Sequence, residues 1–243
     1  MISTAWRFIF LHVPKTGGNS MQLVLQPYSD DELFAGGQGD GTQRFGVRGP
    51  VTPNKHATLQ AYSDALGGDL SEWRIAVTAR DPLRRAVSHY FSPNRWAKTA
   101  GAARWNRKAF LAMLPGMLTL TDFVTVDGVV REPDRLIRQE HLEGDFAAFV
   151  RAVGLPLDAS ILPRVNQSAA ASVLHDEAMA DPGVREAVRS RFAADYELLD
   201  AWSRQSAGAP AQAIRFKASP MASTASGVVA QEHMNRTVPS VNR

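Results

Sequence analysis

The sequence contains no cysteine among its 243 residues, which excludes disulfide bonds and thiolate metal sites. It also lacks an HExxH element or a similarly spaced group of histidine and carboxylate residues, and we predict no metal site. No apolar run approaches the ~20 residues that a transmembrane helix needs, so we expect no membrane span. These absences point away from disulfide-stabilised, metal-dependent and membrane-spanning proteins.

The charges are nearly balanced, with 27 Lys and Arg residues against 24 Asp and Glu residues and a formal net charge of +3. This small excess suits anionic ligands but argues against a dedicated nucleic-acid-binding protein, and we expect no nucleic-acid partner. The length allows one substantial hydrophobic core. We therefore predict one domain over residues 1–204 and a disordered tail over 205–243, where Ala, Ser, Gly and Pro are frequent.

The most informative segment is RFIFLHVPKTGGNSM, at residues 7–21. Its apolar run, 8–13, predicts a buried strand of a parallel sheet, and the polar residues that follow predict a helix start. The first amides of such a helix favour an anion, and the preceding lysine adds a full positive charge. The lysine precedes the glycines, so this is not a Walker A loop. We interpret six residues as a phosphate-binding loop: Lys15, Thr16, Gly17, Gly18, Asn19 and Ser20.

A second strand-like run, 74–79, ends at Arg80 and is followed by Asp81-Pro82, a strong helix start. In the predicted helix, Arg85 and Ser88 are three residues apart and therefore share a face. A guanidinium and a hydroxyl at the carboxyl end of a strand suit a dianionic monophosphate. Two such strand–loop–helix units predict an α/β fold, with a parallel sheet flanked by helices and a ligand at the carboxyl edge of the strands.

The two motifs together resemble those of the sulfotransferases that use 3′-phosphoadenosine 5′-phosphosulfate. Residues 13–20 resemble the 5′-phosphosulfate loop, most closely in the carbohydrate branch that includes heparan sulfate 2-O-sulfotransferase, and 80–90 resemble the 3′-phosphate motif. The resemblance implies the P-loop-like sulfotransferase fold, with residues 15–20 at the 5′ end of the donor and Arg80 and Ser88 at its 3′-phosphate. It also implies sulfuryl transfer to an acceptor hydroxyl, on a carbohydrate that can itself be anionic, with adenosine 3′,5′-bisphosphate as the other product.

The resemblance also implies a catalytic base. The family has a Lys/Gly-His element between the two motifs, and Lys55-His56 lies at that position. Histidine titrates near neutrality, so His56 suits the removal of a proton from the acceptor hydroxyl. Lys15 would neutralise the charge that develops on the leaving oxygen. Because some related enzymes use a carboxylate base, Asp30, Asp31 and Asp40 remain alternatives.

Other segments lead to further expectations. Residues 93–119 are rich in Arg, Lys and Trp, which fits either an acceptor-binding lobe for an anionic glycan or a helix with a solvated basic face. We expect helices over 121–154 and 181–202, and a glycine-rich irregular segment over 27–54. Asn166 lies in a stretch similar to a family loop that closes over the nucleotide. The animal enzymes of the branch carry a membrane anchor, whereas the first motif here begins at residue 7, which predicts a soluble, cytoplasmic bacterial enzyme.

Two other functions stay open at this point. A nucleotide or small-molecule kinase would share the phosphate-binding loop, but it would need Mg²⁺ and a carboxylate to hold the ion. A non-catalytic module for anionic glycans or nucleic acid would instead use the basic stretch that contains the tryptophans.

Overall fold

The computed structural model describes residues 1–35, 45–92, 105–158, 162–163 and 172–206. Within this part of the chain, the largest sheet has four strands in the order β1–β2–β5–β8. These are β1 (Ile2–Ser3), β2 (Phe8–Leu11), β5 (Arg74–Ala79) and β8 (Arg135–Arg138). Strand β2 is parallel to β5, and β5 to β8, whereas β1 is antiparallel to β2. The predicted α/β class is thus confirmed, but the sheet is mixed rather than purely parallel.

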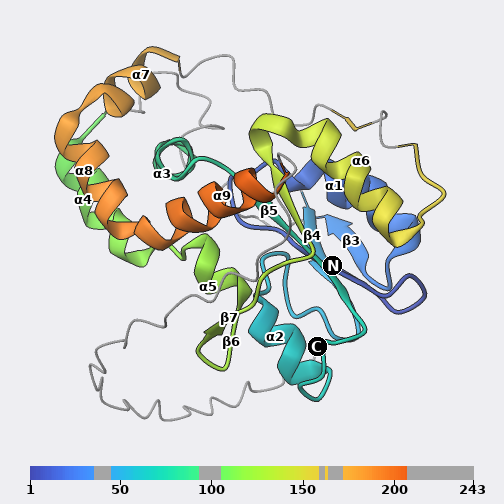
Figure 1. Ribbon diagram of the computed structural model, residues 1–243. Helices are drawn as coiled ribbons and strands as arrows, with labels where there is room; N and C mark the ends of the chain where they lie inside the picture. Colours follow the sequence, from blue (N-terminus) through green and yellow to red (C-terminus); the bar gives the residue numbers. More distant parts are fainter. Residues whose placement is uncertain (36–44, 93–104, 159–161, 164–171, 207–243) are drawn as a thin grey trace, which may run out of the picture.

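Helices cover both faces of this sheet (Figure 1). One face is packed by α1 (Gly18–Leu25) and α6 (Leu142–Val153). The other face is packed by α2 (Leu59–Ala65), α5 (Leu120–Val124) and α9 (Ala193–Ser206). Strand β2 supplies side chains to both cores in alternation, because successive residues of a strand point to opposite faces. All four of its residues must therefore be apolar, and all four are fully buried.

A third apolar cluster lies beside the sheet and is built mainly from helices, on the left of Figure 1. Its helices are α3 (Pro82–Tyr90), α4 (Arg107–Met113), α7 (Ser172–Ala180) and α8 (Pro182–Arg191). The described part of the chain also has three short 3-10 helices, η1 (Gln26–Tyr28), η2 (Leu114–Gly116) and η3 (Gln139–His141). None of the helices in the described residues combines the length and the apolar character that a bilayer crossing requires.

The predicted helix over 121–154 is wrong for its central part. The structure has α5, then a hairpin of β6 (Thr125–Val126) and β7 (Val129–Val130), then β8 and α6. The hairpin turns at Asp127-Gly128, where φ is 50° and 77°, a dipeptide that strongly favours this turn. Strand β8 has only two buried apolar residues between two arginines, a pattern too short to show a strand period.

Two further predictions need correction. The helix expected over 181–202 is divided into α8 and α9 at Phe192, whose buried ring belongs to the helical cluster. The irregular segment expected over 27–54 contains an antiparallel hairpin, formed by β3 (Glu32–Ala35) and β4 (Phe45–Arg48). Residues 207–243, which make up nearly all of the predicted tail, lie outside the described residues.

Candidate functional site

The predicted phosphate-binding loop lies between the carboxyl end of β2 and the start of α1. Helix α1 begins at Gly18, so Gly18, Asn19 and Ser20 form its first turn, at the end of a helix that favours anions. Gly17 precedes the helix with φ 86°. A Cβ there would meet only ordinary contacts, so it is the backbone angle that requires glycine. The loop thus joins the end of a buried strand to the start of a helix, as the sequence predicted.

Thr16 points into the protein, and its side chain fixes the shape of the loop. Its Oγ1 donates to the carbonyl oxygen of Val13 at 2.6 Å and lies 2.6 Å from Oγ1 of Thr78 on β5. The amide of Val13 also donates to Thr78 Oγ1, at 3.0 Å. These bonds tie the loop to the neighbouring strand, so the predicted ligand contact of Thr16 would come from its backbone amide.

Lys15 connects the loop to the end of α3. Its Nζ donates to Oγ of Ser92, two residues beyond the helix, at 3.0 Å. Its backbone has φ 71°, a left-handed conformation that costs a non-glycine residue on the order of 1 kcal/mol. Such strain is often found at functional sites, where the surrounding structure holds a side chain in place.

The second predicted motif meets the first at the same edge of the sheet. Arg80 follows β5 directly, and its Nη1 donates to the carbonyl oxygen of Lys15 at 3.3 Å. Asp81 caps α3 by accepting the amide of Arg84 at 2.8 Å, and Pro82 is the first helical residue, as the sequence predicted. Ser88 is buried on this helix. Lys15 and Arg80 therefore lie together at the carboxyl ends of two adjacent parallel strands.

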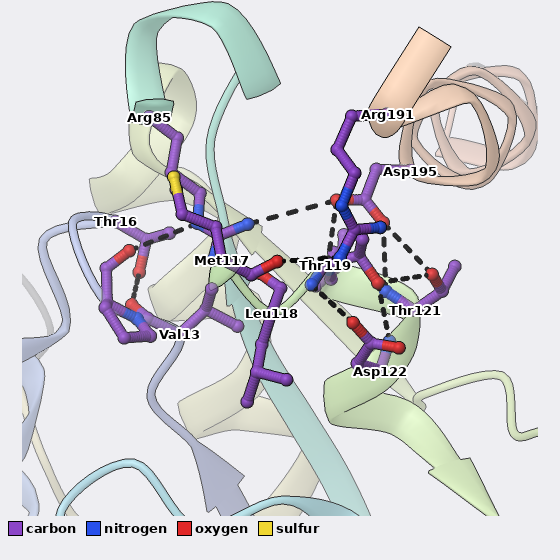
Figure 2. A network of polar contacts seen from close by, with 12 residues as sticks. Val13, Thr16, Arg85, Met117, Leu118, Thr119, Thr121, Asp122, Arg191 and Asp195 are labelled. Atoms are coloured by element: carbon purple, nitrogen blue, oxygen red, sulfur yellow. Dashed lines mark hydrogen bonds and ion pairs between the residues drawn. The ribbon is translucent and has the colours of Figure 1, made fainter. Parts of the chain in front are cut away.

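Arg85 extends from α3 toward the loop and supports it, a role that the sequence did not reveal (Figure 2). Its Nε donates to the carbonyl oxygen of Pro14 at 3.3 Å, and its Nη2 donates to that of Leu118 at 2.5 Å. Its Nη1 lies 4.0 Å from Oδ2 of Asp195 on α9, and both side chains are almost fully buried. Arg85 thus joins the loop to the helical cluster. The sequence feature that could have indicated this role is the three-residue spacing of Arg85 and Ser88, which places both on one face of the helix.

His56 lies beside the loop in a defined tautomer. Its Nδ1 is 2.8 Å from the carbonyl oxygen of His12, and because a carbonyl can only accept, Nδ1 carries the proton and Nε2 the lone pair. The pKa of His56 is lowered to about 4, mainly by burial; the bond to His12 opposes this shift, and the nearby cations Lys55, Lys15 and Arg85 add to it. At neutral pH the ring is therefore neutral, with a lone pair on Nε2, as a general base requires.

The residues around His56 are engaged in the fold. Lys55 is buried, and its Nζ donates to the carbonyl oxygen of Phe45 at 2.9 Å and lies 3.7 Å from the centroid of the Phe45 ring. Burial lowers the pKa of Lys55 to about 8. These contacts attach the turn that carries the base to β4.

The alternative bases are placed differently. Oδ2 of Asp31 accepts the amide of Ile2 and Oγ1 of Thr52, both at 2.9 Å, and Oδ2 of Asp30 accepts the amide of Thr4 at 3.0 Å. Both carboxylates therefore bind the β1 segment rather than the loop. Asp40 and Asn166 lie outside the described residues.

The basic stretch over 93–119 is described only from Trp105 onward. Trp105 packs against Tyr90 and Phe110, with ring centroids 5.4 and 5.3 Å away, in the helical cluster. Arg107 forms an ion pair with Asp181 at 3.4 Å. For these residues the structure favours the anchored helix over the acceptor-binding lobe.

The end of β8 adds two residues for which the sequence predicted no role, because that strand was predicted as helix. Gln139 and Glu140 follow β8 at the same edge of the sheet. The Cγ of Gln139 lies 3.6 Å from the position that a Cβ on Gly17 would take. Oε1 of Glu140 accepts the amide of Asp81 at 3.2 Å. The third parallel strand thus contributes to both motifs.

The low pKa of His56 has a consequence for stability. In the unfolded chain His56 takes up a proton near pH 6.5, whereas the folded protein keeps it neutral down to about pH 4. Between these values the unfolded state binds more protons, so the free energy of unfolding falls as the pH falls. Urea unfolding at pH 7 and at pH 4 measures this loss of stability. We expect His56→Gln to abolish on the order of 3 kcal/mol of it. The exposed His141→Gln serves as the control, and equal pH profiles for both variants would contradict the expectation.

In the part of the chain that the structure describes, no three His, Asp or Glu side chains are grouped so that they could hold a metal ion. No protein-family model, curated protein or solved structure matches the chain.

Proposed function

We propose that the protein is a sulfotransferase, which moves a sulfuryl group from 3′-phosphoadenosine 5′-phosphosulfate to an acceptor hydroxyl, with a carbohydrate as the preferred acceptor class. The observation that carries the proposal is the bond from Arg80 to the backbone of Lys15 at 3.3 Å. It brings together two predicted anion-binding elements, 65 residues apart in sequence, which would suit a ligand with phosphates at two ends.

The residues present fit such a donor. The first turn of α1 and the Lys15 ammonium offer a site for its 5′ end, while Arg80 and Ser88 offer one for its 3′-phosphate. Oδ1 of Asn19 is buried in this turn and has no hydrogen-bond partner among the described residues. An acceptor atom of this kind would be satisfied by a hydroxyl of a bound ligand, because a buried polar group without a partner is costly.

The proposed reaction assigns a task to each of two side chains. The acceptor oxygen attacks the sulfur, the bond from sulfur to the bridging oxygen breaks, and its electron pair stays on the 5′-phosphate. His56 takes the acceptor's proton on Nε2. Lys15 neutralises the bridging oxygen, where charge grows in the transition state, so its effect falls mainly on kcat. The negative charge of the donor would also raise the pKa of His56, which makes the base stronger once the donor is bound.

Calorimetry with adenosine 3′,5′-bisphosphate tests this function without knowledge of the acceptor. We expect micromolar or tighter binding in the presence of EDTA, and much weaker binding of adenosine 5′-monophosphate, which lacks the second phosphate. Binding of ATP that depends on Mg²⁺ would favour a kinase instead. Strongly salt-dependent binding of nucleic acid or of an anionic glycan, with no heat from either nucleotide, would favour a non-catalytic module.

A further inference from the structure

His12 lies between the candidate base and the helix that carries the anion-binding turn. Its carbonyl oxygen accepts Nδ1–H of His56 at 2.8 Å, and its ring packs against the His56 ring with centroids 4.6 Å apart and an interplanar angle of 57°. One of these contacts comes from the backbone of His12 and the other from its side chain. The placement of this single residue therefore affects both the tautomer and the orientation of His56.

Helix α1 holds the ring of His12 in place. The ring is 4% exposed, and its Nδ1 lies 2.9 Å from Oε1 of Gln22. A Cβ on Gly18 would overlap the His12 ring, so the ring occupies the space that a side chain at position 18 would need. Gly18 and Gln22 are four residues apart and share one face of the helix. The ring of His12 is thus fixed between this face and His56.

We propose that His12 is a positioning residue, held by Gly18 and Gln22, which keeps the His56 imidazole in the orientation and tautomer that a general base needs. The base role of His56 rests on the proposed function, whereas the positioning itself does not. The proposal gives Gly18 a reason to be glycine that is independent of any phosphate. It also means that α1 fixes the anion-binding turn and the base together, because both are attached to the same helix.

Nitrogen-15 spectra of the imidazole rings at pH 7.5 test the positioning directly. In the wild-type protein we expect one neutral tautomer of His56, with the proton on Nδ1. His12→Leu keeps the buried volume but removes the ring, and the milder Gly18→Ala displaces the ring. The carbonyl oxygen of residue 12 remains in both variants, so the tautomer reports the orientation of His56. We expect the unsupported His56 ring to turn away from that oxygen, and the ratio of the two tautomers to change tenfold or more. Gly144→Ala is the matched control, since Gly144 also lies in a helix and a Cβ there meets no atom within 4 Å. An unchanged His56 spectrum in both test variants would overturn the proposal.

A kinetic cycle separates positioning from a general loss of structure. We expect His12→Leu to lower kcat about tenfold in the wild-type background and to have no further effect when His56 is already alanine, because it acts through that residue. A tenfold loss in both backgrounds would contradict the proposal. The spectra require no activity, so the two proposals can fail separately. If the tautomer ratio changes as expected but adenosine 3′,5′-bisphosphate does not bind, the sulfotransferase function is wrong and the positioning stands.

Discussion

Replacing Lys15 with alanine should lower kcat for sulfuryl transfer by a factor of about 10² to 10³. The lysine is the cation of the loop, and it would act on an oxygen that becomes charged only as the bond to sulfur breaks. Losing one group that stabilises such charge typically costs about 3–4 kcal/mol of transition-state binding. The KM for the donor should change much less than kcat, because the charge is smaller in the ground state.

The measurement is the rate at which labelled sulfate moves from the donor to an acceptor. A screen that detects the mass added by sulfation would first identify this acceptor. Lys108→Ala is the control, because this lysine is exposed on α4, away from the loop contacts. Lys15→Arg keeps the positive charge but replaces the compact ammonium with a planar guanidinium, so it should recover only part of the rate. If Lys15→Ala lowers kcat less than threefold, or raises the KM alone, the role given to Lys15 is wrong.

Replacing Arg85 with methionine should destabilise the folded protein by about 3–5 kcal/mol, the range found when one partner of a buried ion pair is removed. The change would leave the Asp195 carboxylate buried without its cation. Burial already raises the pKa of Asp195, although the amides of Leu120 and Thr121 and the charge of Arg85 oppose that rise. The carbonyl oxygens of Pro14 and Leu118 would lose a donor at the same time.

Urea unfolding measures this loss, and a surface pair provides the comparison. Arg48 and Glu32 form an ion pair at 3.2 Å with both side chains largely exposed, so Arg48→Met should cost at most about 1 kcal/mol. Combining Arg85→Met with Asp195→Leu should restore part of the stability, because the second change removes the unpaired charge. A loss below about 1 kcal/mol for Arg85→Met would show that the network in Figure 2 does not support the loop energetically.

The sequence was most informative where short-range rules decide the structure. The apolar run before Lys15 and the Asp81-Pro82 pair predict a strand end and a helix start from neighbouring residues alone, and the structure has both. Strand β8 could not be predicted in this way, because Leu136 and Ile137 are too few to distinguish a strand from one turn of a helix. Its position depends on pairing with β5, which is a property of the whole fold.

The candidate site shows the same division. The residue types in the loop and at Arg80 could be interpreted locally, because parallel strands bring their carboxyl ends to one edge. The support given by Arg85 and the orientation of His56 could not, because they depend on partners such as Asp195 and the carbonyl of His12, which are distant in sequence. Such contacts also explain why Thr16, which was predicted as a ligand residue, directs its side chain into the protein.

The central claim is that Lys15 and Arg80 hold opposite ends of one doubly phosphorylated nucleotide, and calorimetric titration of two arginine variants tests it most directly. Arg80→Gln should weaken the binding of adenosine 3′,5′-bisphosphate at least tenfold while leaving that of adenosine 5′-monophosphate nearly unchanged. Arg84→Gln, at an exposed position near the start of α3, should leave both unchanged. If Arg80→Gln weakens the binding of both nucleotides equally, or the binding of neither, then Arg80 does not bind the 3′-phosphate and the account of the site is contradicted.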